Sequence, residues 1–462
     1  MDGAAQIRFT FAGHEMAVSS VTTDSRTVIP GSLFVPLVGT RQDGHEYIRD
    51  ALKNGASVVL VNRTEYMKNA QIYAAVSQKR PRPVFIPVPD TLTALQDAAR
   101  CHAGQFSSLV RIGITGSNGK TTTKEIVKAL LSVKFRVIAN EGNLNSETGL
   151  PLSLFNIRAE HQVGVFELGM NKPGEIAALA AVLRPKIALI TNISSSHIEF
   201  FGSRERIAAE KKQIFSYAIP SCTAFIPAGD AFADFLPPNT GWAIIRYGDL
   251  AKAGISRVKN EGLSGTGFDY EGLPVLFPLL GAHNLRNAVA AISIARHLGL
   301  TPEEVRAGLE SVRPLFGRSQ IVRGDVTILQ DCYNANPESM AVALDFFRDL
   351  AAPGRKALVL GDMLELGDAS PAAHQQVVSA ALETGALVVL IGPGMCGAYG
   401  VAKKIGNGEG RVALFAGTED GDMERAGEAL KKKLKKGDVV LIKGSRGIRM
   451  ERITAILEAA HV

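Results

Sequence analysis

The chain has few of the residues that mark several protein classes. Only four cysteines occur, Cys101, Cys222, Cys332 and Cys396, and no two of them form a CxxC pair. Such spacing indicates reduced thiols in a reducing compartment, and it excludes a disulfide framework and a cysteine-rich zinc site. Aromatic residues make up 6% of the chain and include one tryptophan. No aromatic residues are interleaved with basic ones in the manner of a nucleic-acid surface, so we expect no nucleic-acid partner.

Long hydrophobic runs and a strong net charge are also missing. No apolar run approaches the roughly 18 residues of a membrane span, and the run at residues 386–391 has the length of a strand, so we expect no membrane-spanning helix. The first residues lack a basic flank before an apolar core, so we expect no secretory signal and a cytoplasmic protein. Because 51 basic residues oppose 45 acidic ones, the field averaged over the chain is weak. The dense basic run 431–436 lies late on a predicted helix, where cations complement the helix dipole.

The length of 462 residues predicts about three domains. Residues 1–108 alternate short strands and helices, which indicates a small α/β domain. Residues 109–316 predict a central P-loop ATPase domain with a parallel sheet covered by helices on both faces. Its turn-rich part, 221–278, is expected to extend the domain with antiparallel strands. Residues 317–462 predict five strands that alternate with helices in a Rossmann-like, doubly wound domain without a dinucleotide motif. The fold class is therefore α/β throughout.

The strongest local signal is TGSNGKT, between a predicted strand and a predicted helix. Small residues let backbone N–H groups converge on a phosphate, and a lysine such as Lys120 reaches the outer phosphates. The hydroxyl of Thr121 would bind Mg²⁺. Strict P-loop spacing requires glycine at position 114, where this chain has isoleucine, so an ordinary glycine-rich turn remains the alternative. The candidate phosphate-binding residues are Thr115, Gly116, Ser117, Asn118, Gly119, Lys120, Thr121 and Thr122.

Two further polar side chains follow later strands of the central domain. Glu167 closes a predicted strand, and His197 follows the strand that ends near residue 192. In open parallel sheets, ligands gather at the carboxyl ends of the strands. Taken singly, Glu167 is a surface acid and His197 is a loop residue. Beside Lys120 and Thr121, however, the two favour a site for the metal that neutralises nucleotide phosphates.

Several segments resemble, in one order and over nearly the whole chain, the Mur ligase family. They read DSR, GTRQDGH, TGSNGKTT, GNLNSETGLPLSL, FELGMNKPGEI, TNISSSHIEFFGS, LGAHNLRN, DCYNANPESM, VLGDMLELG and KGSRGIRME. The resemblance implies a UDP-substrate domain, a central ATPase domain and a C-terminal domain that receives the amino component. The YNANP, GDMLELG and KGSRG blocks resemble the branch that joins D-alanyl-D-alanine to UDP-N-acetylmuramoyl-tripeptide. This implies an ATP-dependent ligase of peptidoglycan precursor synthesis that works as a monomer, through an acyl phosphate, and releases ADP and phosphate.

The resemblance also implies the roles of single residues. The catalytic residues would be Lys120, Glu167, His197, Lys211 and Arg318. Two Mg²⁺ ions would be held by Thr121, Glu167, His197 and a carbamate that CO₂ forms on Lys211. The nucleotide would be contacted by Asn284, Asn287, Arg318 and Asp331. The substrates would be contacted by Ser25, Arg26, Asp43, Gly44, His45, Asn143, Asn145, Asn334 and Asn336.

Some assignments stay open at this point. The family has alanine where this chain has Glu210, and Lys212 adjoins Lys211, so either lysine is a candidate for the carbamate. The Asn334 to Pro337 turn lines the amine-side pocket or simply starts a helix, since proline suits a first helical turn. His374 is a second residue expected in that pocket.

The function also has alternatives. His45 and Asp43 contact the uridine diphosphate or belong to a plain loop. A sister ligase that adds a single amino acid, and a nucleotide switch without ligase chemistry, are the alternatives to the predicted function. The YNANP and KGSRG blocks argue against a folylpolyglutamate-type synthetase, which shares the ATPase core. Closure of the C-terminal domain, which would deliver Asp331 and Arg318 to the nucleotide, is a hypothesis.

Overall fold

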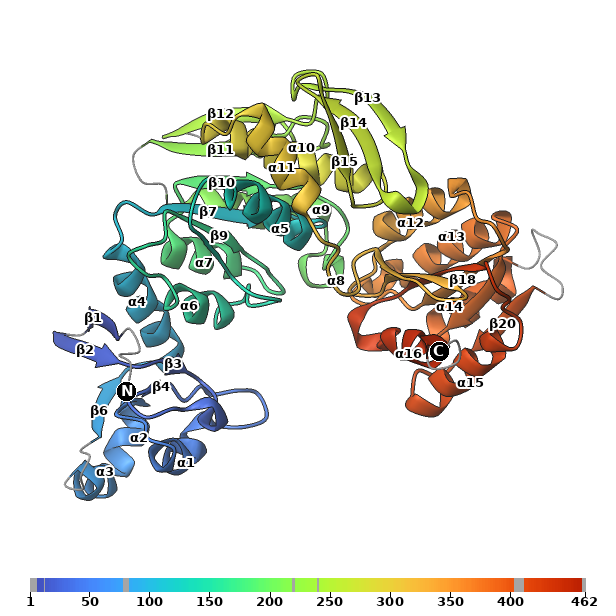
Figure 1. Ribbon diagram of the computed structural model, residues 1–462. Helices are drawn as coiled ribbons and strands as arrows, with labels where there is room; N and C mark the ends of the chain where they lie inside the picture. Colours follow the sequence, from blue (N-terminus) through green and yellow to red (C-terminus); the bar gives the residue numbers. More distant parts are fainter. Residues whose placement is uncertain are drawn as a thin grey trace.

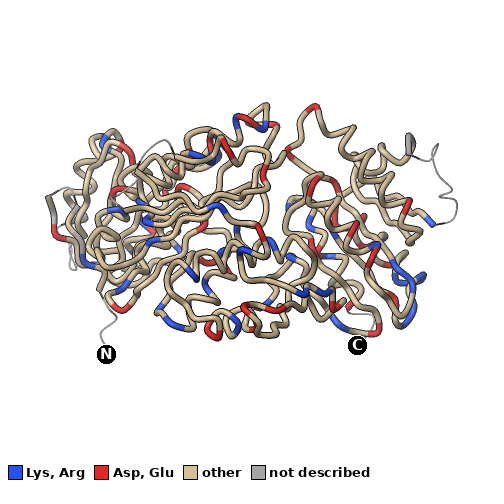
Figure 2. Tube along the Cα trace, turned by 90° about the horizontal axis from the view of Figure 1, so that it is seen from above, with Lys and Arg blue, Asp and Glu red and all other residues tan. Residues whose placement is uncertain are grey.

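The computed structural model describes residues 6–11, 13–77, 83–217, 221–238, 241–402 and 411–458. Three α/β units follow one another along the chain, and the central unit lies between the other two (Figure 1). Acidic and basic residues are interspersed over all three units (Figure 2). Among the described residues, no helix is long and apolar enough to cross a membrane.

The N-terminal unit is built on a four-stranded parallel sheet in the order β3-β4-β5-β6. These strands are Val21–Thr22, Leu33–Phe34, Val58–Asn62 and Val84–Val88. A separate antiparallel pair precedes them, β1 (Ile7–Phe11) and β2 (His14–Val18). The helices are α1 (Ile48–Lys53), α2 (Arg63–Lys68), α3 (Ala70–Ser77) and α4 (Thr91–Gly104). Helix α4 packs on β1 and also on two helices of the central unit, so one hydrophobic core runs through both units.

The central unit contains a six-stranded parallel sheet in the order β12-β11-β10-β7-β9-β8. The strands are β7 (Val110–Thr115), β8 (Val137–Ala139), β9 (Val163–Glu167), β10 (Ile187–Ile190), β11 (Cys222–Pro227) and β12 (Trp242–Tyr247). Every residue of β9, β10 and β11 is buried. Their continuous apolar character therefore follows from helices on both faces, as the sequence predicts.

Two sets of helices cover this sheet. The core cluster on one face contains residues of α4, α6 (Gly149–Leu154), α7 (Glu175–Leu183) and α9 (Arg204–Lys212). The cluster on the other face contains residues of α5 (Lys120–Leu131), α10 (Ala282–His297) and α11 (Pro302–Ser311). The short helix α8 (Ile198–Phe201) lies next to α9. Strand–loop–helix units therefore bring the loops after β7, β9 and β10 to one edge of the sheet.

The expectation for residues 221–278 is partly wrong. Strand β11 pairs in parallel with β10, and β12 pairs in parallel with β11, so both extend the main sheet without reversing direction. The antiparallel strands form a separate three-stranded sheet of β13 (Ile255–Asn260), β14 (Thr266–Tyr270) and β15 (Leu273–Phe277). Glu271 and Gly272 link β14 to β15 with φ values of 47° and 82°. Such a two-residue connection makes a hairpin, whereas the long connection after Pro227 leaves room for a parallel return.

The C-terminal unit has a six-stranded sheet in the order β16-β17-β21-β18-β19-β20. The predicted five strands are β17 (Thr327–Asp331), β18 (Lys356–Gly361), β19 (Leu387–Ile391), β20 (Val412–Phe415) and β21 (Val439–Lys443), all parallel. An unpredicted strand, β16 (Gln320–Val322), pairs antiparallel at the edge. The helices are α12 (Pro337–Asp349), α13 (Ser370–Glu383), α14 (Pro393–Ala402), α15 (Asp420–Lys431) and α16 (Glu451–Glu458). The predicted α/β fold class is confirmed.

The contact between α5 and α11 generates a stability prediction. A Cβ added at Gly308 of α11 would lie 2.6 Å from the backbone Cα of Leu130 in α5. Alanine favours a helix over glycine by about 1 kcal/mol, but overpacking against backbone costs about 1–3 kcal/mol. We therefore expect Gly308→Ala to lower the calorimetric melting temperature.

A matched control is available in α14. A Cβ at Gly397 would meet nothing within 4 Å, so Gly397→Ala should stabilise its unit by up to about 1 kcal/mol. If both variants raised the melting temperature, the close α5–α11 packing would be disproved.

Candidate active site

The predicted phosphate loop joins the end of β7 to the start of α5. Gly119 is the N-cap of α5 with φ 77°, and a Cβ there would lie 2.5 Å from Asn287 Oδ1. A Cβ at Gly116 would lie 1.8 Å from Thr191 Oγ1. Both glycines are therefore required by close neighbours as well as by backbone conformation. The helix N-terminus that follows supplies the partial positive charge which an anion needs.

Lys120 lies over this loop. Its Nζ donates to the carbonyl oxygens of Gly116 at 2.9 Å and Ser117 at 3.2 Å. Burial lowers the pKa of Lys120, and the nearby carboxylate of Glu167 partly offsets that effect. The ammonium is thus placed within reach of a phosphate bound in the loop.

A buried carboxylate forms the centre of the site. Glu167, at the end of β9, is 2% exposed. Its Oε2 accepts from the hydroxyl of Thr121 at 2.6 Å, and its Oε1 accepts from Asn145 Nδ2 at 2.7 Å. Arg318 Nη2 donates to Thr121 Oγ1 at 2.8 Å. One hydrogen-bonded group around this carboxylate therefore joins residues from four separate segments, and all four residues were predicted for the site.

This donor set fits Mg²⁺. Mg²⁺ prefers oxygen ligands and is usually bound by one or two carboxylates together with waters and phosphates. Glu167 and Thr121 offer such oxygens beside the phosphate loop. Within the described part of the chain, no group of three or more His, Cys, Asp or Glu residues could hold a metal by itself. The arrangement therefore suits an ion that shares its coordination with a nucleotide.

Arg318 is held in place by an aromatic ring. Its guanidinium carbon lies 3.9 Å from the ring centroid of Tyr333, which follows β17 in the C-terminal unit. The Arg446 guanidinium lies 5.9 Å from the same centroid. Arg318 therefore joins the Thr121–Glu167 pair to the C-terminal unit through one stacked side chain.

The two adjacent lysines of α9 are now distinguished. Lys211 is 1% exposed, and its Nζ lies 3.5 Å from the sulfur of Met170. Burial, together with the positive charge of Lys120, lowers the pKa of Lys211 well below its ordinary value. Lys212 instead donates to the Phe235 carbonyl at 2.8 Å and is partly exposed.

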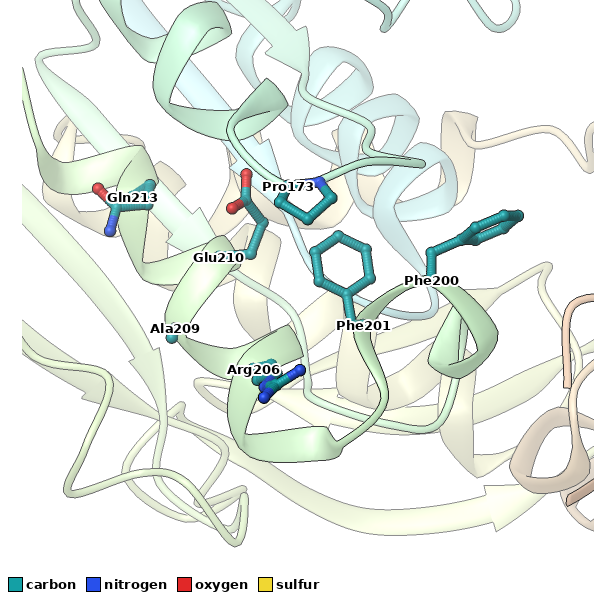
Figure 3. Close-up of a pocket in the computed structure, with 7 residues that line it drawn as sticks. All are labelled: Pro173, Phe200, Phe201, Arg206, Ala209, Glu210 and Gln213. Atoms are coloured by element: carbon teal, nitrogen blue, oxygen red, sulfur yellow. The ribbon is translucent and has the colours of Figure 1, made fainter. Parts of the chain in front are cut away.

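The unusual Glu210 has a structural role. Its carboxylate accepts the backbone N–H groups of Gly174 and Ile176, both at 3.0 Å, at the N-terminus of α7. An anion at this end of a helix is stabilising. Glu210 also lines a hollow of about 280 Å³ beside α9 (Figure 3). Lys211, the next residue of this helix, is buried. The other lining residues are Pro173, Phe200, Phe201, Arg206, Ala209 and Gln213.

His197 contacts the C-terminal unit. It is the N-cap of α8, in the left-handed region with φ 64°. Its Nδ1 lies 2.6 Å from Oε2 of Glu365, in the loop after β18. The close contact with the His197 ring lowers the pKa of Glu365. Sequence reasoning missed Glu365, which lies within the GDMLELG block.

Asn336 both starts a helix and touches the phosphate loop. It caps α12, accepting from Ser339 N–H at 2.8 Å, so the helix-start interpretation of this turn is confirmed. Its Nδ2 also donates to Asn118 Oδ1 at 2.7 Å and forms a short bond to Ser196. The Glu338 carboxylate accepts Ser195 N–H at 3.0 Å. The C-terminal unit therefore reaches the loops after both β7 and β10.

The expected nucleotide residues are held in hydrogen bonds. Asn284 and Asn287 are buried in α10 and joined by a bond of 3.2 Å from Asn287 Nδ2 to Asn284 Oδ1. Asp331 pairs with Lys443 at 2.6 Å and accepts Ser319 N–H at 3.1 Å. Burial works to raise the pKa of Asp331, but the Lys443 ammonium overcomes this, and the net shift is downward. Lys443, in the KGSRG block, was not predicted.

The remaining predicted substrate residues form no side-chain hydrogen bond with Glu167 in the described part of the chain. His45 Nδ1 contacts Asp43 at 2.6 Å, and its Nε2 accepts Asn62 N–H at the end of β5 at 3.0 Å, so both ring nitrogens have partners within the N-terminal unit. Gly44 is in the same loop of the N-terminal unit. Three others are placed as follows: Ser25 is buried, Arg26 is exposed and paired with Asp24, and Asn143 is exposed.

Two residues expected in the amine-side pocket have local hydrogen-bond partners. Asn334 Oδ1 accepts the N–H of Ala335. His374 is buried within the C-terminal unit, where its Nε2 accepts Met363 N–H at 3.0 Å. Its Nδ1 lies 2.7 Å from the Ser370 carbonyl oxygen. His374 therefore fixes the loop after β18, and the pocket role expected of it stays a prediction.

Comparison with known proteins gives the family. Its sequence profiles match three consecutive stretches: "Mur ligase family, catalytic domain" at residues 17–102, "Mur ligase middle domain" at 114–295 and "Mur ligase, glutamate ligase domain" at 317–446. The "UDP-N-acetylmuramoyl-tripeptide--D-alanyl-D-alanine ligase" of Treponema pallidum is 43% identical over 95% of this chain and 93% of its own.

Solved structures agree with the profiles. A crystal structure of MurF from Acinetobacter baumannii superposes with a TM-score of 0.81 at 28% identity, covering 96% of this chain and 94% of that one. MurF from Thermotoga maritima in complex with ADP gives 0.78 at 30% identity, covering 96% and 97%. Fold and site together define a three-unit enzyme that binds a nucleotide through a phosphate loop. The chain belongs to the Mur ligase family, which confirms the resemblance seen in the sequence.

The stacked position of Arg318 generates a prediction. Lysine keeps the charge but cannot lie flat on Tyr333 and bond Thr121 at the same time. If these contacts contribute about 1.4 kcal/mol to the free energy of ADP binding, their loss weakens ADP binding tenfold. We expect Arg318→Lys to weaken ADP binding about tenfold in a calorimetric titration.

The control is Arg323→Lys. Arg323 is exposed and donates to the Leu263 carbonyl at 3.3 Å, away from the Thr121–Glu167 pair, so ADP binding should not change. Wild-type affinity in Arg318→Lys would mean that the stacked contact has no part in nucleotide binding.

Proposed function

We propose that this chain is an ATP-dependent ligase that joins D-alanyl-D-alanine to UDP-N-acetylmuramoyl-tripeptide. The observation that carries the proposal is the buried Glu167–Thr121 pair beside Lys120 and Arg318, in a chain that aligns with ligases of that name over 95% of its length. Residues 1–108 would bind the UDP substrate, 109–316 the ATP, and 317–462 the dipeptide. The substrate contacts expected of Ser25, Arg26, Asp43, Gly44, His45, Asn143, Asn145, Asn334 and Asn336 belong to this proposal.

The reaction needs an activated acyl group. A peptide carboxylate is a poor acyl donor because its leaving group would be oxide. Transfer of the γ-phosphoryl group of ATP gives an acyl phosphate and ADP. The free amine of D-alanyl-D-alanine then attacks the acyl carbon, phosphate leaves with the C–O electron pair, and the amine loses a proton. The products are an amide, ADP and phosphate.

Charge is the main obstacle, because carboxylate and triphosphate are both anions. Lys120 would stabilise charge on the outer phosphates, and Arg318 would add a second fixed cation beside Thr121. Glu167 and Thr121 would hold Mg²⁺, and His197 is a further candidate ligand. When bound, the metal neutralises the phosphates and polarises the transferred group.

Lys211 suits carbamylation better than Lys212. Only an uncharged amine attacks CO₂, and the lowered pKa of Lys211 favours that form, whereas Lys212 is partly exposed to solvent. The nitrogen bonds to the carbon of CO₂, one proton leaves to solvent, and the product is an anionic carbamate. Its oxygens would be ligands for a second Mg²⁺ near the positive charge of Lys120.

Water must be kept from the acyl phosphate. The contacts of Asn336 with Asn118 and of Glu338 with Ser195 bring the C-terminal unit over the loops after β7 and β10. Such closure would exclude water and deliver the dipeptide to the activated carboxyl group.

The direct test is phosphate release from ATP with UDP-N-acetylmuramoyl-tripeptide, with and without D-alanyl-D-alanine. We expect release to require the dipeptide and to disappear in Lys120→Ala, because this variant removes the ammonium that lies over the loop. Single amino acids serve as controls. Release driven by one of them would identify a sister ligase, and release indifferent to every amine would overturn the ligase function.

A second test concerns the carbamate. Enzyme in ¹³C-bicarbonate should show a ¹³C carbamate resonance that Lys211→Ala removes and Lys212→Ala retains. Because the pKa of Lys211 is lowered, the amine stays reactive below the pH at which an ordinary lysine is fully protonated. The resonance should fade once the pH falls through that lowered pKa. Loss of the signal in Lys212→Ala instead would assign the modification to Lys212.

A further inference from the structure

The loop after β18 carries the GDMLELG block, and the mechanism above leaves this block without a role. Its Glu365 is the residue that meets His197 of the central unit, with Nδ1 and Oε2 2.6 Å apart. Glu199 N–H also approaches the Glu365 carbonyl oxygen at 3.4 Å. The contact therefore joins the two units through a side chain and a backbone group.

The loop is anchored on three sides. The carboxylate of Asp362 accepts Gly394 N–H at 3.0 Å and Met395 N–H at 2.7 Å, at the start of α14. Met363 N–H donates to His374, and Leu364 N–H donates to Ser445 Oγ at 2.9 Å. The three residues before Glu365 are thus fixed to the body of the C-terminal unit, while its own side chain is partly exposed and contacts His197.

Both partners adopt an unfavourable backbone conformation. Glu365 has φ 61° and His197 has φ 64°, values that L-residues with side chains rarely adopt. A conformation of this kind costs about 1 kcal/mol or more, and it persists where the surrounding structure enforces it, frequently at functional sites. Here the two strained residues face each other across a boundary between units.

The pair has the chemistry of a metal-binding imidazole and a carboxylate that orients it. An imidazole that binds a metal through one nitrogen commonly gives the proton of the other nitrogen to a carboxylate, which fixes the tautomer and the ring orientation. With Nδ1 turned to Glu365, the nitrogen left for a ligand is Nε2. Among the described residues, this 2.6 Å contact with Glu365 Oε2 is the one partner of the buried Nδ1, although the two groups are not aligned as a regular hydrogen bond.

We propose that Glu365 is a positioning residue that accepts the Nδ1 proton of His197 and aims Nε2 at the nucleotide-bound metal. The proposal rests on the metal role of His197 in the proposed function. Because Glu365 belongs to the C-terminal unit, His197 is correctly oriented only when that unit is docked. The docking of the C-terminal unit that delivers the amine then also completes the metal site.

The test measures metal affinity without turnover. Mn²⁺ is titrated into the full-length chain with ADP, and free Mn²⁺ is followed by its electron paramagnetic resonance signal. Removing such a support typically weakens metal binding 10–100-fold, so Glu365→Ala should weaken Mn²⁺ binding by about tenfold or more. Glu365→Gln, whose amide oxygen also accepts the proton, should stay within about threefold of the wild type. Asp368→Ala, an exposed acid three residues further along, is the matched control and should not change binding.

A double-mutant cycle shows whether Glu365 acts through His197. In a His197→Ala background, Glu365→Ala should cause no further loss of Mn²⁺ affinity, and melting curves confirm that each variant is folded. Equal losses with and without His197, no loss in Glu365→Ala, or the same loss in Glu365→Gln as in Glu365→Ala would each overturn the proposal. The assay contains no dipeptide and no acceptor peptide, so its outcome is independent of the phosphate-release test.

Discussion

The structure of the central site depends on one buried negative charge. Removing a carboxylate from water is costly unless hydrogen bonds and cations replace its hydration. Glu167 meets this constraint with Thr121 from α5 and Asn145 from the loop before α6, and Lys120 and Arg318 supply positive charge nearby. Each contribution fixes the position of the segment that provides it. The phosphate loop, the end of β9 and the segment entering the C-terminal unit are therefore placed relative to one another by the same charge.

The same constraint explains why the C-terminal unit takes part in a site built mainly on the central one. Arg318 lies between them, stacked on Tyr333 and bonded to Thr121. Asn336 and Glu338 add polar contacts to the loops after β7 and β10. A surface that approaches phosphates must be polar, and its polar groups need hydrogen-bond partners. These paired side chains provide such partners. An apolar contact of similar area would hold the units together without orienting any group.

Much of the fold is predictable because its signals are local. Parallel strands covered on both faces appear as continuous apolar runs, and the phosphate loop has glycines at positions where Asn287 and Thr191 leave no room for a side chain. Glu167 could be predicted for the same reason, because the end of a predicted strand indicates where the next side chains lie. The antiparallel strand β16 and the separate sheet β13–β15 were missed or misplaced, because pairing partners are set by long-range packing.

The missed site residues share a cause. Lys443 is separated from Asp331 by 112 positions in the chain, so no periodicity or spacing links them. Glu365 and His197 come from different units, and their contact exists only once both have folded. Glu210 stood out as a departure from the family pattern, but its hydrogen bonds to the N-terminus of α7 could be recognised only in the structure.

The continuous core around α4 has a mechanical consequence. Helix α4 buries residues against both the N-terminal sheet and the helices α6 and α7, and His102 of α4 lies 3.3 Å from the Ile157 carbonyl oxygen. The C-terminal unit instead has two core clusters of its own, to which the central unit adds Leu280 and Leu263. Under load or heat the first two units should therefore behave as one cooperative block, with the third as a separable module. Such a division lets selection replace the amine-binding module without rebuilding the part that activates the acceptor.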